Sequence, residues 1–315
     1  MNENYKKLVD LIFPYASNQE ARIRNENKKF CHYTSADAAI KIIKNKEVWL
    51  RHYSFMNDYM EVDHGLDCLI HAYSEESTFI KALNDIQPSL SGEVEKIFNE
   101  VIKGLKQNLY LLSVSEHEVE EDSIGRLSMW RAYGKDSGVA LILNNEAFQS
   151  TAQVLNTWAT PVIYADKLAF QNELKKLAEG FLKEKDFLKK IPLNELAIKI
   201  TNAFLFSVIS TKHLGFKEEK EWRVVFFSDS GSEYVKEEIV TILGVPQRVY
   251  KIPLKNIPDR GLTGLCLNEL IDRIIIGPTS QPIHMRDLFI SELQKAGVVN
   301  AEEKVFVSDI PLRKE

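Results

Sequence analysis

The chain has 315 residues, 44% of them hydrophobic and 27% charged, which is typical of one large or two small folded domains. Its net charge of −5 argues against broad nucleic-acid binding and leaves room only for a local basic groove. The three cysteines are scattered and odd in number, which argues against a disulfide framework and favours a reducing compartment.

The beginning of the chain carries no targeting pattern. It lacks the basic start, apolar run and small-residue cleavage site of a signal peptide, and no apolar run reaches the roughly 18 residues of a membrane span. We therefore expect a cytoplasmic protein with no membrane partner. The first helix is expected to be amphipathic, with Leu8, Leu11 and Ile12 facing inward.

Helical patterns dominate the next hundred residues. Ser35 is a natural N-cap for a short helix, and Asn57 and Asp58 can cap a later one. Between them, alternating apolar residues predict a strand over 48–53. Further helical patterns lie near 77–88 and 93–106.

The middle of the chain mixes strands with an acidic segment. Residues 109–115 predict a strand, and the acidic residues 116–125 are expected to form an exposed loop. Residues 167–213 are expected to form a helical insertion that Pro192 divides. The intervening predictions are a helix near 126–133 and strands over 138–143 and 159–166.

The last third of the chain is expected to be mainly β. Strands scattered between helices indicate an α+β fold with a mixed, mainly antiparallel sheet core. We predict a single α+β domain over 1–315, within which 167–213 is an insertion. The late predicted elements are strands at 221–227, 248–254, 272–278 and 304–309, and a helix near 282–296.

One predicted helix face carries residue types that bind metals. His64, Cys68 and His71 recur at helical spacing, but a structural zinc site needs a fourth ligand and usually draws on two elements. The alternative is a half-buried helix face, and we expect no metal.

Polar and aromatic clusters elsewhere each have an ordinary structural interpretation. HYT at 32–34 can be a plain strand end, and residues 54–61 can be a capped helix with a solvated face. Residues 128–143, which contain Trp130 and Arg131, can be core packing. They can equally form a pocket wall, since aromatic faces stack on planar ligands and arginine binds phosphate.

The last cluster, residues 215–227, contains two carboxylates that are two positions apart. On a strand, Glu219 and Glu221 point to the same side, where their repulsion raises a pKa unless a cation or a ligand lies between them. Arg223, on that side, can compensate them as in an exposed edge strand. The residues expected to face the core are then Trp222, Val224 and Phe226.

Together these clusters resemble DUF2971, a bacterial family of uncharacterised function. The similar residues run from HYT at 32–34 to IIIGP at 274–278. Between these ends lie, in order, FxND with a following glutamate (55–61), SVSE, MWRAYG with GVALIL, and EKEWR. The N-terminal helix and the middle insertion are less typical of the family.

The stretch HYTSADAAIKIIKNKEVWL is also similar, more weakly, to the opening of ADP-ribosyltransferase-type folds. This resemblance implies an ADP-ribosyltransferase-like fold that takes NAD as its substrate. His32 would then bond the ribose hydroxyls beside nicotinamide, and Thr34 with the backbone beside it would orient the nicotinamide amide. Tyr33 would be a further NAD-binding residue. Glu221 would be the catalytic carboxylate, in an E-x-E pair that Glu219 completes.

The same resemblance implies further NAD-binding residues. Arg51 or Arg131 would hold the pyrophosphate, and Trp130 or Tyr133 would stack on a ring. The sequence departs from the pattern on the middle strand, where a Ser-Thr-Ser run is expected. Ser113 and Ser115 are nearest to it, and no second histidine or tyrosine is placed on that strand.

Three functions follow from these patterns. The first is an enzyme that transfers ADP-ribose to a protein or nucleic acid, or hydrolyses NAD, as a toxin or an anti-phage effector; His32 and Glu221 must then face one cleft. The second is a non-enzymatic module that binds a small nucleotide or a partner protein, with Glu219 or Glu221 paired to Arg223 and His32 buried without a cleft. The third is a metal-dependent nuclease, whose candidate ligands are Asp58, Glu61, Glu219 and Glu221.

Overall fold

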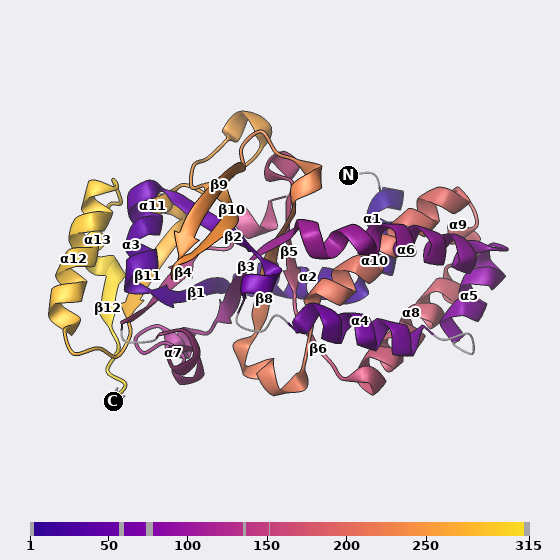
Figure 1. Ribbon diagram of the computed structural model, residues 1–315, viewed down its shortest axis with the longest axis horizontal. Helices are drawn as coiled ribbons and strands as arrows, with labels where there is room; N and C mark the ends of the chain where they lie inside the picture. The colour runs from indigo at the N-terminus through magenta and orange to yellow at the C-terminus, as the bar shows by residue number, and fades with distance from the viewer. Residues whose placement is uncertain (1–2, 57–59, 74–77, 135–136, 151, 312–315) are drawn as a thin grey trace. The chain divides into compact units, whose positions relative to one another are not determined.

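The computed structural model describes residues 3–56, 60–73, 78–134, 137–150 and 152–311, which form two compact units (Figure 1). The helical unit consists of Met1–Ala21, Tyr53–Leu109 and Thr160–Lys217, and the sheet unit consists of Arg22–His52, Tyr110–Ala159 and Glu218–Glu315. The expectation of a single domain over 1–315 stays a prediction.

Helices with buried apolar faces make up the helical unit. The amphipathic first helix is confirmed, since Leu8 and Ile12 are buried, and helices lie on both sides of Pro192 as predicted. The elements are α1 (Glu3–Ile12), the first part of α2 (Pro14–Asn25), α4 (Glu61–Ala72), α5 (Thr78–Ile86), α6 (Leu90–Asn108), α8 (Lys167–Lys183), α9 (Lys185–Leu188), α10 (Leu193–Ser210) and the parallel strands β6 (Ile163–Tyr164) and β7 (Thr211–Lys212).

Two of these helices, α4 and α10, approach each other closely at Gly65. A Cβ atom on Gly65 would lie 2.1 Å from the carbonyl oxygen of Val208, so only glycine permits this contact. The predicted caps of this helix, Asn57 and Asp58, lie outside the described residues, and α4 begins at Glu61.

By length and composition, α10 is the one helix in the described part of the chain that could span a membrane. Half of its apolar window is buried inside the protein. A cytoplasmic location stays a prediction.

A ten-stranded sheet forms the centre of the sheet unit. Its path runs β12-β11-β4-β1-β3-β2-β10-β9, and β8 pairs with β3 and β5 beside this path. Only β11 and β12 are parallel among the pairs of the path, which confirms the predicted α+β fold with a mixed, mainly antiparallel sheet. The strands are β1 (Lys29–Ser35), β2 (Glu47–His52), β3 (Leu109–His117), β4 (Gly138–Leu143), β5 (Thr157–Pro161), β8 (Glu221–Phe227), β9 (Lys236–Ile242), β10 (Val245–Pro253), β11 (Ile271–Ile276) and β12 (Val305–Val307).

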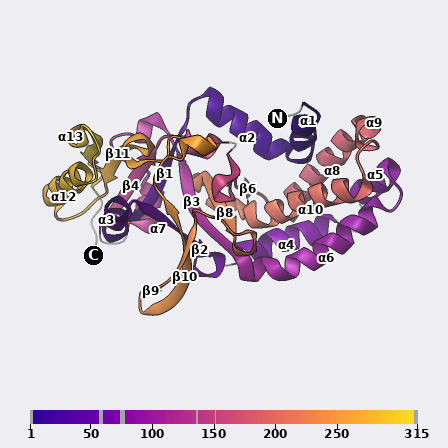
Figure 2. The same cartoon turned by 90° about the horizontal axis from the view of Figure 1, so that it is seen from above.

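One hairpin of this sheet was not predicted. β9 and β10 are joined by Leu243 and Gly244, whose φ values of 51° and 80° are those of a type I′ turn. Figure 2 shows this hairpin extending beyond its neighbouring strand β2. The predicted strand over 159–166 is also divided, because β5 ends at Pro161 and β6 belongs to the helical unit.

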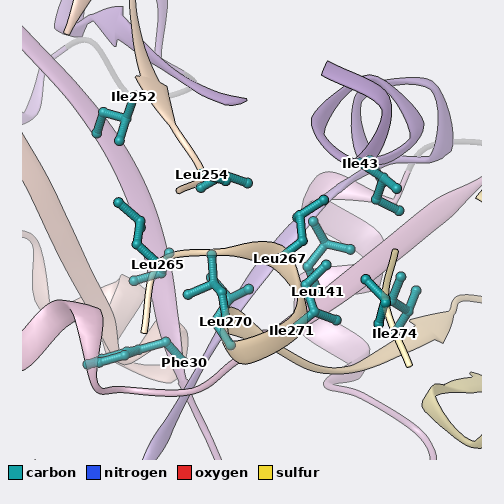
Figure 3. Close-up of a cluster of buried hydrophobic side chains, with 14 of the residues drawn as sticks. Phe30, Ile43, Leu141, Ile252, Leu254, Leu265, Leu267, Leu270, Ile271 and Ile274 are labelled. Carbon is teal, nitrogen blue, oxygen red and sulfur yellow. The ribbon is translucent and has the colours of Figure 1, made fainter. Parts of the chain in front are cut away.

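Two hydrophobic clusters cover the two faces of the sheet, and alternate residues of β4 separate them. Leu141 belongs to the larger cluster, whereas Ala140 and Ile142 belong to the smaller. We call these sides the large-cluster face and the small-cluster face. The large cluster (Figure 3) includes residues of α3 (Ala36–Asn45), α11 (Leu267–Leu270), α12 (Pro282–Lys295) and α13 (Ala301–Lys304), and the small cluster includes residues of α7 (Leu127–Tyr133).

Ser35 connects the sheet to α3. It is the last residue of β1, and its hydroxyl accepts a hydrogen bond from the backbone N–H of Ala38 over 3.2 Å. The predicted N-cap is therefore confirmed, and it fixes the position at which the chain leaves β1.

Candidate functional site

A fork in the sheet lies at the middle of β3. This strand pairs with β1 at residues 115–117 and with β2 at residues 110–111, so residues 112–114 pair with neither. His32 fills the gap, because its Nδ1 lies 3.0 Å from the carbonyl oxygen of Ser113. The carbonyl can only accept, so this contact makes Nδ1 the donor nitrogen of the ring.

Glu221, the first residue of β8, accepts hydrogen bonds from Ser113 and Arg223. The hydroxyl of Ser113 donates to its Oε1 over 2.6 Å, and Nε of Arg223 lies 2.9 Å from the same oxygen. The side chains of Glu221 and Arg223 are only 6% and 2% exposed. Arg223 therefore supplies the compensating cation that the sequence led us to expect, but in the interior rather than on an exposed edge.

The other predicted catalytic residue, His32, is half-buried in apolar surroundings. Burial lowers the pKa of its imidazole, and the bond to the Ser113 carbonyl only partly opposes this shift. The ring lines a cavity of about 20 Å³ whose other lining residues are all aliphatic, among them Leu112 and Leu141. This volume is close to that of one water molecule, so the cavity does not hold a nucleotide.

His32 and Glu221 lie on opposite faces of the sheet and meet at Ser113. Trp222 belongs to the large cluster, so its neighbour Glu221 points to the small-cluster face, as does the Ser113 hydroxyl that bonds it. His32 instead shares its cavity with Leu141 of the large cluster. The two residues thus contact one serine, through its carbonyl and its hydroxyl, and Glu221 does not line the cavity of His32.

The aromatic residues near the fork are mostly buried. Tyr33 accepts a hydrogen bond from the backbone of Arg126 over 2.8 Å, and its ring meets that of Trp130 edge to face at 4.9 Å. Trp130 is 2% exposed, and its indole N–H donates to the carbonyl of Ile124. Trp130 is therefore packed within the small cluster, and its expected stacking on a ligand ring stays a prediction.

The remaining predicted binding residues are spread over the sheet unit. Tyr133 is half-buried, with its hydroxyl 3.4 Å from Glu219, and Arg131 is exposed on the same helix. Arg51 donates from Nη2 to Gln247 over 2.9 Å. The last two are Thr34, which pairs with Val139 in β4, and Ser115, which is buried opposite Cys31.

Glu219 and Glu221 do not occupy one strand, contrary to the expectation. Glu219 ends a 3₁₀ helix, and Lys220 between them has a φ of 46°, so β8 begins only at Glu221. The left-handed residue breaks the alternation that would place the two carboxylates on one side. The strand itself is confirmed, with Trp222 and Phe226 in the core.

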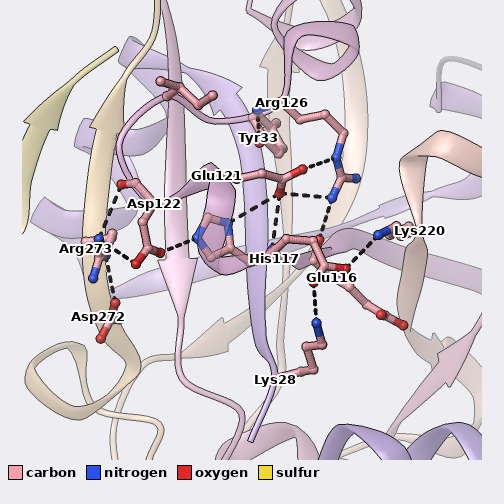
Figure 4. A network of polar contacts seen from close by, with 12 residues as sticks. Lys28, Tyr33, Glu116, His117, Glu121, Asp122, Arg126, Lys220, Asp272 and Arg273 are labelled. Atoms are coloured by element: carbon pink, nitrogen blue, oxygen red, sulfur yellow. Dashed lines mark hydrogen bonds and ion pairs between the residues drawn. The ribbon is translucent and has the colours of Figure 1, made fainter. Parts of the chain in front are cut away.

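The acidic segment is an exposed loop only in part, since Val119, Glu120 and Ser123 are exposed but the first two residues are not. β3 continues to His117, and Glu116 and His117 are 7% and 4% exposed. Arg22 and Arg273, which are far away in the sequence, and the nearby Arg126 neutralise the segment, so its local composition did not reveal the burial of Glu116 and His117. One ion pair is Arg22–Glu116. Figure 4 shows two others, Arg126–Glu121 and Arg273–Asp122.

Arg126, which the sequence analysis did not single out, joins this segment to the approach of β8. Its guanidinium donates to the Glu121 carboxylate over 2.7 Å and to the backbone carbonyls of Glu116 and Glu218, each over 2.8 Å. Glu218 lies 92 residues away, so no local pattern could have predicted the contact.

Glu118 makes a second connection to the same region. Lys220 lies 2.6 Å from its carboxylate, and Lys28 also pairs with it. Hydrogen bonds from Lys220 and then from Lys28 lower the pKa of Glu118 to about 2. Lys220, the residue before Glu221, is thereby held beside the end of β3 by an ion pair.

The other candidate metal ligands lie in the helical unit. Glu61 forms a buried ion pair with Lys212 at 2.7 Å, and Asp58 lies outside the described residues. His64 Nε2 lies 2.9 Å from the carbonyl oxygen of Ala165. Among the residues that the structure describes, no three His, Cys, Asp or Glu side chains form a group that could hold a metal ion.

Comparison with known proteins gives one family match. Residues 129–224, from α7 to the first half of β8, match the family model described as Protein of unknown function (DUF2971). The match agrees with the resemblance found in the sequence. No curated protein and no solved structure matches the chain, so the ADP-ribosyltransferase resemblance has no support from these comparisons.

Proposed function

We propose, from the contacts of Ser113, that this chain is an NAD-utilising, ADP-ribosyltransferase-like enzyme of the DUF2971 family, whose model matches residues 129–224. One observation carries the proposal: the Ser113 hydroxyl bonds the carboxylate of Glu221, on the neighbouring strand, over 2.6 Å. His32 adjoins the carbonyl of the same serine at 3.0 Å. Ser113 therefore connects the strands of His32 and Glu221. The two side chains lie on opposite faces of the sheet and do not face one cleft, so the proposal rests on Glu221 and Ser113 and not on His32.

A carboxylate fixed in this way suits the cleavage of a glycosidic bond. The bond between the ribose C1′ and nicotinamide breaks, its electron pair leaves with the ring nitrogen, and positive charge develops on the ribose. Glu221 would bond the ribose 2′-hydroxyl and stabilise that charge as a preorganised anion. The acceptor then bonds C1′ and loses its proton to solvent; water as the acceptor gives NAD hydrolysis.

Arg223 supports this role because it offsets the cost of a buried anion. Its Nε and Nη2 lie 2.9 and 3.3 Å from the two carboxylate oxygens of Glu221. An isolated carboxylate in the interior is costly, whereas a paired one can stay ionised without a bound ligand.

Release of nicotinamide from NAD by the purified chain tests the proposal. We expect release by the wild type and its loss, by about a hundredfold or more, in Glu221→Gln. Glu237→Gln is the matched control, because Glu237 forms an exposed pair with Arg248 at 2.9 Å. Wild-type protein that neither binds NAD nor releases nicotinamide, with and without cell lysate, would contradict the proposal.

The biological role that fits such an activity is that of a toxin or an anti-phage effector in the cytoplasm, where consumption of NAD arrests growth. Induction of the wild-type chain in a bacterial host is then expected to stop growth, and Glu221→Gln is expected to relieve the arrest. Dependence of nicotinamide release on lysate would indicate a protein or nucleic-acid acceptor. Growth arrest that persists in the variant would contradict this role.

A specific observation favours a second candidate, a non-enzymatic module that binds a nucleotide or a protein. Glu221 is already paired with Arg223 in the interior, and the cavity beside His32 is only about 20 Å³. On this alternative, Glu221→Gln lowers stability without changing any NAD turnover. Thermal unfolding and nicotinamide release measured on the same samples separate the two functions.

A further inference from the structure

Arg126, the residue before α7, uses all of its side-chain donors inside the protein. Its Nε and Nη2 donate to the two carboxylate oxygens of Glu121 over 2.7 and 3.0 Å, and Nη2 also donates to the carbonyl of Glu116 over 2.8 Å. Its Nη1 donates to the carbonyls of Glu218 and Glu219 over 2.8 and 3.1 Å. A guanidinium has five N–H donors in a rigid plane, and these five bonds occupy all of them. The side chain is 11% exposed and is therefore fixed in one orientation.

The two carbonyls that Nη1 binds directly precede a residue in a strained conformation. Lys220 has a φ of 46°, where the Cβ atom of any residue except glycine lies too close to a backbone carbonyl oxygen. A lysine keeps this conformation only when its surroundings hold it there. Arg126 holds the carbonyls before it. From the other side, the backbone N–H of Glu116 donates to the Lys220 carbonyl over 2.9 Å, and Glu118 pairs with its Nζ at 2.6 Å.

The backbone at Lys220 decides the direction in which the chain enters β8. Glu221 is the next residue, and its Oε1 accepts a hydrogen bond of 2.6 Å from Ser113. Because side chains alternate between the two faces of a strand, a changed conformation at Lys220 would turn the Glu221 carboxylate away from the serine. Arg126 can thus control the carboxylate through the backbone.

We propose that Arg126 is a positioning residue for Glu221, which it aims by holding Lys220 in the left-handed conformation. The hold on Lys220 stands on the contacts above, and the effect on catalysis rests on the proposed function. Because Arg126 acts through the backbone of residues 218–220, its loss should weaken the stabilisation of the transition state more than the binding of NAD. The expected signature is a fall in kcat at a nearly constant KM.

Steady-state nicotinamide release by the full chain tests the role in turnover. Arg126→Met removes the five donors and is expected to lower kcat by about tenfold or more, with KM within about twofold of the wild type. Arg126→Lys keeps the charge but has three donors on one nitrogen, so its kcat should lie between the two. Arg273→Met is the matched control, because Arg273 pairs with Asp122 of the same acidic segment, and its other described contacts are with Asp272 and Phe306. It is expected to keep the wild-type kcat.

A rescue at position 220 distinguishes positioning from a general loss of structure. Glycine adopts the left-handed conformation freely, so Arg126→Met/Lys220→Gly should recover part of the kcat that Arg126→Met loses. Arg126→Met/Lys220→Ala removes the same lysine side chain but still resists a positive φ, and it should recover nothing. Equal kcat values of the two double variants would overturn the proposal.

Amide hydrogen exchange of the same proteins without NAD gives a readout that needs no activity. Peptides that cover residues 216–222 are expected to exchange at least about tenfold faster in Arg126→Met, and at the wild-type rate in Arg273→Met. If Arg126→Met does not fold, Arg126→Lys serves for both measurements, because it keeps a cation beside Glu121. Exchange that is unchanged in the folded Arg126 variant would overturn the proposal.

The two readouts separate this inference from the proposed function. Faster exchange around Glu221 in Arg126→Met but not in Arg273→Met, in a chain whose wild type never releases nicotinamide, supports the hold on Lys220 and contradicts the NAD enzyme. Nicotinamide release that Glu221→Gln abolishes and Arg126→Met leaves unchanged contradicts the positioning role alone. A raised KM at constant kcat would assign Arg126 to substrate binding and would also overturn the proposal.

Discussion

Ser113 donates a hydrogen bond of 2.6 Å to Glu221 across the neighbouring strands β3 and β8. Removing the hydroxyl in Ser113→Ala frees one side of the carboxylate without touching its charge or its ion pair. We expect a roughly tenfold or greater fall in kcat for nicotinamide release, with most of the activity restored in Ser113→Thr. Equal activity in the alanine variant would show that the bond is not needed for turnover.

The buried pair of Glu221 and Arg223 predicts a strongly non-additive effect on stability. Arg223→Met leaves a buried carboxylate without its cation and should lower the free energy of unfolding by about 3–5 kcal/mol. The double variant Arg223→Met/Glu221→Leu removes both charges and should recover most of that loss. Urea unfolding of the two single variants and the double variant measures the coupling.

The exposed pair of Glu237 and Arg248 provides the comparison for this cycle. The same substitutions there should give a coupling of at most about 1 kcal/mol, because solvent screens both charges. A coupling free energy of equal size at the two pairs would contradict the prediction that burial strengthens the coupling between Glu221 and Arg223.

Glu118 predicts an acid dependence of stability. Its pKa is lowered to about 2 by Lys220 and Lys28, below the ordinary value of 4.5. The folded state therefore gains stability above pH 4.5, and the gain is lost as the pH falls from about 4.5 toward 2. The unfolding free energy of the wild type should decrease more between pH 6 and pH 3 than that of Glu118→Gln, and parallel decreases would contradict the assignment.

A glycine-to-alanine substitution is expected to have opposite effects on stability in two helices, at Gly65 in α4 and at Gly92 in α6. In Gly65→Ala, the added methyl group would meet the backbone of Val208 at 2.1 Å, so α4 and α10 must separate, at a cost of about 1–3 kcal/mol or more. In α6, Gly92→Ala has no neighbour within 4 Å and should stabilise by about 0.5–1 kcal/mol. Thermal unfolding of both variants measures the difference.

Local patterns predicted most of the secondary structure because its signals are local. Ser35 caps α3 as expected, and the apolar segment 221–227, with Trp222 between Glu221 and Arg223, correctly predicted β8 and the core positions of Trp222 and Phe226. β9 was missed because its first half, Lys236 to Glu238, is charged and its edge is exposed. Charged residues conceal the alternating apolar pattern of a strand when only a small part of its surface is buried.

The candidate site was less predictable because its contacts join distant residues. Ser113 and Glu221 are 108 positions apart, and Ser113 and His32 are 81 apart. The sequence contains the expected residue types. The fork that brings them into contact depends on which strands pair with β3, and local patterns do not encode that pairing. Lys220, whose left-handed backbone separates Glu219 from Glu221, carries no sequence signal such as glycine or asparagine.

The division of both units into three chain segments has a consequence for synthesis. The helical unit needs residues up to Lys217, and the sheet unit alternates with it and is completed only by the strands after Glu218. A nascent chain that ends at Ala159 therefore lacks part of the hydrophobic core of each unit. Its apolar strands stay exposed until the last third of the chain has been translated. Such a chain should depend on ribosome-associated chaperones and fold late, because most of its decisive contacts are non-local.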